Sequence, residues 1–306
     1  MVFKEHNNRN IANKFAEYIT SPVLRQYLAD KVKQYCGNDV TVFDGAAGSG
    51  QLEQFINPKK LYAVEIQEMA CETLKENYPN ADISCQSFFT YDSDIQVDAI
   101  AMNPPYSLKF KELPEEDRTA IQEFCSWKKS GVVDDIFMLK AMKYTKRYGF
   151  FIMFPGITYR ASEKNMRELI GNQLVELNEI QNGFEDTQIN VVFIVLDKQK
   201  TSNKYSGEIY DAKTKRILWQ EENTIDDDKW QIPRIEVEKE EINIDEVNEQ
   251  LDKLVIDRLE NHLASQLMVI QSFHADIDYI GFIEKCRDLL YQYELYYNFG
   301  VERGTK

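Results

Sequence analysis

At its first predicted strand the chain reads Val40-Thr41-Val42-Phe43-Asp44-Gly45-Ala46-Ala47-Gly48-Ser49-Gly50, a β-branched run followed by a turn of small residues. At the junction of a strand and a helix, such a turn lets the backbone approach a ligand while free helical N–H groups face it. The glycines follow the order Gly-x-x-Gly-x-Gly behind an acid, whereas a nicotinamide-binding turn reads Gly-x-Gly-x-x-Gly. The carboxylate of Asp44 favours a ligand with a cationic head over a phosphate.

Strands and helices alternate along the chain on either side of this turn. Apolar, β-branched runs predict further strands at residues 61–64, 83–85, 97–102, 150–154, 174–177 and 191–196. Helical spacing predicts helices over residues 11–34 (with an interruption at Ser21-Pro22), from the turn through Leu52 and Phe55, and over 67–78, 136–142 and 162–170. This alternation predicts an α/β fold with a doubly wound, mostly parallel seven-stranded sheet.

The pattern changes after about residue 200. Residues 208–210 and 216–219 flank a polar turn and predict a β-hairpin, an acidic stretch covers 221–241, and helical periodicity covers 245–298. We therefore expect one domain over residues 1–200 and an acidic, partly helical C-terminal region over residues 201–306.

Composition excludes several classes of protein. Hydrophobic residues make up 43% of the 306 residues, which is enough for a core and excludes general disorder. No run approaches the roughly 18 apolar residues of a membrane span, and the N-terminus lacks the apolar core of a signal peptide. The 5 cysteines and 3 histidines are scattered, so neither a disulfide framework nor a metal site is expected. We expect a cytoplasmic protein with no membrane partner.

Charge is distributed unevenly along the chain. The formal net charge is −15, and the residues after 200 are the more acidic part. Residues 109–167 nevertheless carry 12 Lys and Arg against 8 Asp and Glu. A locally positive face is compatible with a polyanionic partner, although mixed charge on exposed helices accounts for the same pattern.

Two further features lie at predicted strand ends, where open α/β sheets bind ligands. Glu65 ends the second strand, 21 residues after Asp44, where an acid can accept hydrogen bonds from both hydroxyls of a ribose. Asn103-Pro104-Pro105-Tyr106 ends the fourth strand. A Pro-Pro turn that merely closes a buried strand is the alternative interpretation of this tetrapeptide.

With these motifs, the sequence resembles class I S-adenosylmethionine-dependent methyltransferases, specifically the branch that methylates the amino group of adenine in DNA. Residues 103–106 resemble its catalytic tetrapeptide, and Thr20-Ser21-Pro22 is similar to the N-terminal cofactor motif of members in which the cofactor half precedes the catalytic half. Type I modification subunits and related solitary enzymes share that order. The resemblance covers roughly residues 8–200 and implies S-adenosylmethionine as cofactor, bound by Thr20, Ser21, Asp44, Ala46, Gly48, Gly50, Glu65, Ile66, Ser87 and Phe88.

One cofactor position departs from the family pattern. The third strand of the family usually ends in Asp-Phe, where this chain has Ser87-Phe88. A serine hydroxyl accepts a hydrogen bond from the adenine amine of the cofactor more weakly than a carboxylate does. We therefore expect a modest affinity for the cofactor.

The resemblance implies a mechanism that needs no titrating base. The side-chain oxygen of Asn103 and the carbonyl of Pro104 accept hydrogen bonds from the N6 amine, and Tyr106 stacks on a base flipped out of the helix. Pro105 stiffens the same loop. Phe184 is a candidate for the second face of the base, with core packing as the alternative, and Lys109 and Lys111 are candidates for contact with the DNA backbone.

Three functions stay open at this point. The first is methylation of adenine N6 in DNA. The second is methylation of RNA adenine or of a protein glutamine, since the tetrapeptide suits any planar amine or amide. The third is a non-catalytic subunit with a methyltransferase fold. The acidic C-terminal region has no DNA-reading motif, so the helices over 245–298 are expected to bind a protein specificity partner or to form a homodimer, with a helical lid on the protein's own core as the alternative.

Overall fold

The computed structural model describes residues 3–4, 20–184, 190–226, 228–235, 243–273, 278, 280–288 and 290–291. The chain divides into two units, Met1–Ile235 and Glu236–Lys306. Each unit is described by itself. The first half of the helix expected over 11–34 lies outside the described residues.

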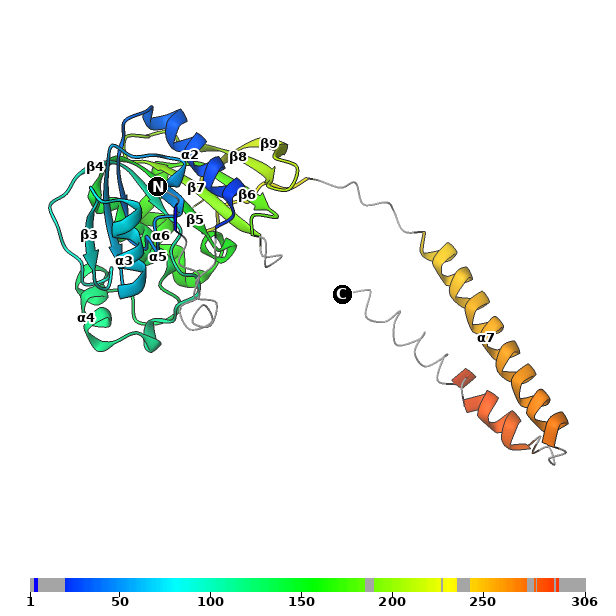
Figure 1. The fold of residues 1–306 in the computed structure, drawn as a ribbon. Coiled ribbons are helices and arrows are strands. Elements are labelled where there is room, and N and C mark those ends of the chain that lie inside the picture. The colour runs from blue at the N-terminus through cyan, green and yellow to red at the C-terminus, as the bar shows by residue number, and fades with distance from the viewer. Residues whose placement is uncertain are drawn as a thin grey trace. The chain divides into compact units, whose positions relative to one another are not determined.

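The first unit is built on one nine-stranded sheet of order β3-β2-β1-β4-β5-β7-β6-β8-β9 (Figure 1). Most neighbouring strands run parallel, whereas β7 is antiparallel to β5 and β6, and β9 is antiparallel to β8. The strands are β1 (Thr41–Asp44), β2 (Lys60–Glu65), β3 (Asp82–Cys85), β4 (Val97–Met102), β5 (Thr145–Met153), β6 (Leu174–Gln181), β7 (Val191–Asp197), β8 (Lys204–Asp211) and β9 (Arg216–Thr224).

The seven predicted strands are all present, and the α/β class with a mostly parallel sheet is confirmed. The predicted hairpin adds two strands to the same sheet, because β8 pairs with β6 in parallel. Tyr205 and Ile209 of β8 and Trp230 beyond β9 are each 2% exposed. A boundary at residue 200 would cut through this packing, so the first unit extends to Ile235.

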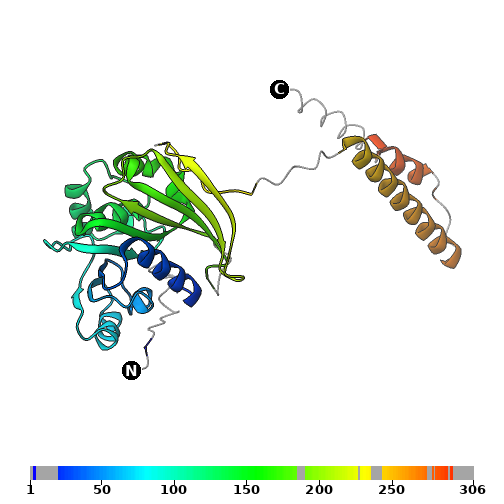
Figure 2. The same cartoon turned by 90° about the horizontal axis from the view of Figure 1, so that it is seen from above.

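Helices cover both faces of the sheet (Figures 1 and 2). They are α2 (Pro22–Cys36), α3 (Glu68–Asn77), α4 (Glu115–Phe124), α5 (Asp134–Ala141) and α6 (Lys164–Ile170). Alternate residues of a strand point to opposite faces, so β5 sends Phe150 and Ile152 into the core beneath α2 and Phe151 and Met153 into the core beneath α5. Buried on both sides, the central strands have the near-continuous apolar sequence of a parallel sheet.

Local sequence explains where α2 begins. The Ser21 hydroxyl accepts a hydrogen bond from the Leu24 N–H at 3.3 Å, and Pro22 occupies the first helical turn, where no N–H is needed. The prediction of a helix after the glycine-rich turn is wrong, because only a 3-10 turn forms there, at Leu52–Gln54. Gly50 has φ +80° and Pro58 disfavours helical backbone at the residue before it, which leaves too short a segment for an α-helix.

The second unit contains α7 (Ile244–Phe273), a helix of 30 residues with no buried side chain, and helical residues at 280–288. The helical prediction for this region is confirmed over the residues that the structure describes. Large apolar side chains of α7 are exposed, including Val247, Leu251, Leu254, Val255, Ile256, Leu263, Leu267, Met268, Val269 and Phe273. Within the described residues, no helix combines the length and hydropathy that a membrane span needs.

Candidate active site

The glycine-rich turn at the end of β1 is tied to the end of β2. The Gly48 N–H donates to Oε2 of Glu65 at 2.8 Å, and the Ala47 N–H donates to the Val64 carbonyl at 3.1 Å. Asp44 accepts from the Ala46 N–H at 2.8 Å. These bonds bring the two predicted acids, Asp44 and Glu65, to one edge of the sheet.

Glycine is needed in this turn for two different reasons. A Cβ on Gly45 would lie 2.5 Å from the ring of Phe88, so Gly45 makes room for a core side chain as well as for a ligand. Gly50 has φ +80°, and a Cβ there would lie 2.4 Å from the ring of Tyr78. The backbone follows this path only where no side chain is present.

A second buried acid, Glu53, lies behind the turn and was not singled out from the sequence. Glu53 is fully buried, and within the described residues neither of its oxygens has a hydrogen-bond donor. Burial raises the pKa of Asp44 to about 7, and burial beside Asp44 raises the pKa of Glu53 well above its usual range. Burial and the mutual repulsion of the two carboxylates therefore disfavour the state in which both are ionised.

The tetrapeptide leaves the end of β4 next to the start of α2. The Asn103 Nδ2 donates to Oγ1 of Thr20 at 2.8 Å, and the Tyr106 hydroxyl donates to Oδ1 of Asn103. Tyr106 is buried, and Pro104 is buried beside it. These bonds connect the Asn103 amide to the start of α2 on one side and to Tyr106 on the other.

One cavity of about 450 Å³ joins the turn and the tetrapeptide. Its lining includes nearly all of the predicted cofactor and catalytic residues: Thr20, Asp44, Ala46, Gly48, Glu65, Ile66, Ser87, Phe88, Asn103, Pro104, Pro105 and Tyr106. Ser21 and Gly50 are not part of the lining, because Ser21 caps α2 and Gly50 packs against Tyr78. Among the described residues no group of His, Cys, Asp and Glu is arranged to hold a metal ion.

The third strand contributes Ser87 and Phe88 to this cavity. The Ser87 hydroxyl accepts a 3.3 Å hydrogen bond from the Phe89 N–H and is partly exposed to the cavity. Phe88 stacks on Phe137, which also lines the cavity, with ring centroids 5.4 Å apart and planes 6° apart, so each ring holds the other in place. Ile66 is 54% exposed at the rim.

The three candidates for substrate contact lie in different surroundings. Lys109 lines the cavity and pairs with Glu112 at 2.9 Å, whereas Lys111 is exposed outside it. Phe184 is 7% exposed within the core cluster beneath α2, which also contains Tyr106, and it does not line the cavity. This position agrees with the alternative interpretation of Phe184, in which its side chain packs in the core.

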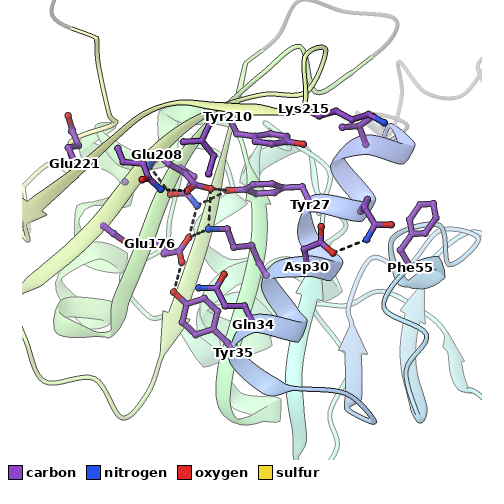
Figure 3. Close-up of a pocket in the computed structure, with 18 of the residues that line it drawn as sticks. Tyr27, Asp30, Gln34, Tyr35, Phe55, Glu176, Glu208, Tyr210, Lys215 and Glu221 are labelled. Carbon is purple, nitrogen blue, oxygen red and sulfur yellow. Dashed lines mark hydrogen bonds and ion pairs between the residues drawn. The ribbon is translucent and has the colours of Figure 1, made fainter.

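A second cavity, of about 1080 Å³, lies between α2 and strands β6, β8 and β9 (Figure 3). Lys31 lies 2.6 Å from Glu176 and 3.1 Å from Glu208, and the hydroxyls of Tyr27 and Tyr35 donate to the same two carboxylates. The buried acids on its floor are thus engaged by groups of α2. This network holds α2, and with it Thr20, against the sheet.

Solved structures with the same arrangement share the fold at low sequence identity. The type I restriction-modification methyltransferase subunit from Streptococcus thermophilus is 15% identical, with a TM-score of 0.55, over 65% of this chain and 49% of that one. A modification subunit of a putative type I restriction enzyme from Vibrio vulnificus YJ016 is 14% identical, with a TM-score of 0.54, over 68% of this chain and 52% of that one. This chain therefore spans about half the length of these two proteins.

A third structure comes from work on complex assembly and conformational transition in a type I R-M system. Its chain is 11% identical, with a TM-score of 0.57, over 88% of this chain and 69% of that one. No curated protein matches the sequence.

The sheet order, together with a cavity at the carboxyl ends of β1, β2 and β4, is that of the Rossmann-like methyltransferase fold. The family model for N-6 DNA methylases matches residues 5–247, and the chain belongs to that family. The match includes β8 and β9, in agreement with their place in the sheet.

Proposed function

We propose that this protein transfers a methyl group from S-adenosylmethionine to N6 of an adenine flipped out of DNA. The observation that carries the proposal is the single cavity lined both by the turn after β1 and by Asn103–Tyr106. A methyl donor and an acceptor amine held in one cavity react as an intramolecular pair, and such positioning supplies most of the catalysis. Membership of the N-6 DNA methylase family supports both DNA and adenine as the target.

The chemistry of the turn fits this cofactor. S-adenosylmethionine supplies a methyl group on a positively charged sulfur, which the amine takes with loss of one of its protons. Asp44 and Glu65 give the cavity buried carboxylates suited to an ammonium group and to ribose hydroxyls. Ser87, Phe88 and Ile66 are the residues of the lining that would surround an adenine ring.

Asn103 is the residue that would orient the target amine. Its Oδ1 faces Tyr106 and its Nδ2 is bound to Thr20, so the oxygen is the end of the amide that an amine N–H would meet. A carbonyl oxygen has two lone pairs, one of which Tyr106 occupies. For its ring to stack on a base, Tyr106 leaves its buried position and releases this lone pair to the substrate.

Contact with the DNA backbone needs cationic side chains. Lys109 lies at the cavity and Lys111 on the neighbouring surface, and both belong to the locally basic segment 109–167. Since the second unit is acidic, we assign backbone contact to this part of the first unit.

We further propose that α7 binds a protein partner that supplies recognition of the DNA sequence. The helix exposes an apolar series that includes Leu251, Leu254, Leu263 and Leu267, each at least 41% exposed, and contiguous exposed apolar surface marks interaction sites. The structural relatives named above are subunits of type I systems, which supports a partner subunit. Analytical ultracentrifugation of the full chain, alone and mixed with the specificity subunit of a type I system, tests this. Self-association alone would favour a homodimer instead.

The substrate is tested by offering unmethylated double-stranded DNA, RNA of the same sequence and a protein extract to the enzyme together with methyl-labelled S-adenosylmethionine. The proposal predicts label in DNA, recovered as N6-methyladenine after digestion to nucleosides. Label confined to RNA or to protein glutamine would contradict DNA as the substrate but would not affect the assignment of the fold. Cofactor binding without any transfer would favour a non-catalytic subunit.

A further inference from the structure

The segment after Tyr106 turns sharply and is held by residues much further along the chain. Ser107 has φ +62°, in the left-handed region that residues other than glycine rarely adopt. Its backbone N–H donates to Oδ1 of Asp134 at 2.8 Å. Immediately after it, residues 108–110 pair with residues 131–133 through backbone hydrogen bonds of 2.9 Å. These hydrogen bonds tie the segment that follows the tetrapeptide to the start of α5.

Asp134 is an unusual residue for its position. It is the first residue of α5 and has no exposed surface, and burial raises its pKa to about 6. Among the described residues its Oδ2 has no hydrogen-bond partner, and the nearest cation, Nη1 of Arg160, lies 3.6 Å away. Arg160 is itself fixed, with its guanidinium 5.0 Å from the ring centroid of Phe154.

A buried carboxylate is costly unless its hydrogen bonds compensate for the loss of water. The short bond that Asp134 makes is the one to the Ser107 N–H, directly after the last residue of the tetrapeptide. A backbone donor in the left-handed conformation has no regular partner in a strand or helix, so Asp134 supplies the acceptor that this turn needs.

We propose that Asp134 is a positioning residue of the active site. It holds Ser107 in the left-handed conformation and so sets the direction in which Tyr106 and Asn103 leave β4, while Arg160 neutralises its charge from the other side. Asp134 does not line the cavity and touches no reacting atom. Its effect on catalysis rests on the proposed function, whereas its effect on the backbone does not.

Amide hydrogen exchange tests the backbone part without any substrate. In protein labelled with 15N-serine, the Ser107 amide of Asp134→Ala is expected to exchange about tenfold faster than in the wild type, because one hydrogen bond is lost. Asp134→Asn keeps an oxygen acceptor and is expected to stay within about threefold of the wild type. The matched control is Asp135→Asn, which loses the buried bridge to Lys128 (2.7 Å) but leaves Ser107 bonded.

The three variants separate positioning from general loss of stability. Asp135→Asn is expected to lower the melting temperature without faster exchange at Ser107, and Asp134→Ala is expected to show faster exchange there with native spectra elsewhere. Unchanged exchange in Asp134→Ala would overturn the proposal. So would exchange that rises equally at Ser107 and at distant serines in both Asp134→Ala and Asp135→Asn, since that pattern means global opening.

Measurements of methyl transfer by the same variants test whether Asp134 affects catalysis. For Asp134→Ala we expect kcat on DNA to fall about a hundredfold, as for a misplaced catalytic group, with the Kd for S-adenosylmethionine within about twofold of the wild type. Asp134→Asn is expected to recover most of kcat. A Kd that rises while kcat is unchanged would overturn the assignment to the tetrapeptide. If the wild type itself transfers no methyl group to DNA, the proposed function fails, and the exchange result still decides whether Asp134 holds the turn.

Discussion

Thr20 and Asn103 are 83 residues apart in the sequence and are joined by a 2.8 Å hydrogen bond from Nδ2 of Asn103 to Oγ1 of Thr20. Thr20 precedes α2, and Asn103 follows β4. The bond connects the N-terminal motif, which the family resemblance assigns to the cofactor, directly with the tetrapeptide that we propose to be catalytic. The Thr20 carbonyl also accepts from Nε of Arg25 at 2.7 Å, so the residue is fixed on both sides.

The hydroxyl of Thr20 is therefore expected to orient the Asn103 amide. Thr20→Val keeps the shape but removes the acceptor, so that Nδ2 loses its partner and the amide is free to turn its oxygen away from the substrate. We expect kcat on DNA to fall about tenfold, in line with the loss of one hydrogen bond. Thr20→Ser keeps the hydroxyl and is the control. Equal rates for Thr20→Val and Thr20→Ser would contradict the role given to this bond.

Two glycines allow the stability cost of an unfavourable backbone conformation to be measured separately from the cost of a steric clash. Gly37 (φ +76°) and Gly50 (φ +80°) share a positive φ, but a Cβ on Gly37 meets nothing within 4 Å, whereas one on Gly50 would lie 2.4 Å from Tyr78 and 2.6 Å from Leu74. Gly37→Ala is expected to cost about 1–3 kcal/mol of unfolding free energy. Gly50→Ala is expected to cost a further 1–3 kcal/mol or so. Chemical denaturation of both variants measures the difference, and equal losses would show that the turn relaxes around the added methyl group.

The buried acids of the cofactor turn predict how stability depends on pH. Burial raises the pKa of Asp44 to about 7, above its ordinary value, so folding disfavours the ionised form. The associated stability is fully present below the ordinary pKa of an Asp, near pH 4, and is lost progressively as the pH rises from there to about 7. Melting temperature is therefore expected to fall between about pH 4 and pH 7, more steeply in the wild type than in Glu53→Gln, where a neutral amide replaces the second acid.

Two other buried carboxyl groups also make the protein less stable as the pH rises. Burial raises the pKa of Asp134 to about 6 and that of Glu163 to about 7, so Glu53→Gln is expected to reduce the pH slope rather than remove it. A slope that is identical in the wild type and in Glu53→Gln would show that Glu53 does not contribute to the pH dependence of stability.

The network in the second cavity predicts a large effect of one lysine. Lys31 is 12% exposed and contacts both Glu176 and Glu208, so Lys31→Met leaves two buried carboxylates without their cation. We expect a loss of about 3–5 kcal/mol. The matched control is Lys204→Met, which removes an exposed pair with Glu222 and is expected to cost less than about 1 kcal/mol. Similar losses for the two variants would mean that solvent reaches the network.

Sequence patterns predicted the parts of the fold that follow from local rules. The strand at 97–102, the helix boundary at Ser21-Pro22 and the acids at the ends of β1 and β2 each depend on a few neighbouring residues, and the structure places them as expected. The continuation of the sheet through β8 was not predicted, because pairing with β6 is a tertiary contact. For Phe184 the sequence left two interpretations, a face of the base site or core packing, and the structure places its side chain in the core.

The residues missed around the site share one property. Glu53, Asp134 and Arg160 act through buried partners on other segments of the chain, namely Asp44, Ser107 and Asp134, and each resembles an ordinary surface charge when it is read alone. A signal was present for Asp134 and Asp135, which stand at the start of a helix whose other positions are almost all apolar and buried. Two adjacent acids at the start of an almost entirely apolar helix therefore predict buried carboxyl groups, each with a specific partner.

The central claim is that Asn103 and its neighbours present an adenine amine to a bound methyl donor. The direct test is transfer of label from methyl-labelled S-adenosylmethionine to unmethylated DNA by the wild type and by Asn103→Ala, with calorimetry to establish that both bind the cofactor. We predict N6-methyladenine with the wild type and at least a hundredfold less with Asn103→Ala at similar cofactor affinity. Equal transfer by the two proteins, or transfer to a base other than adenine, would contradict the account.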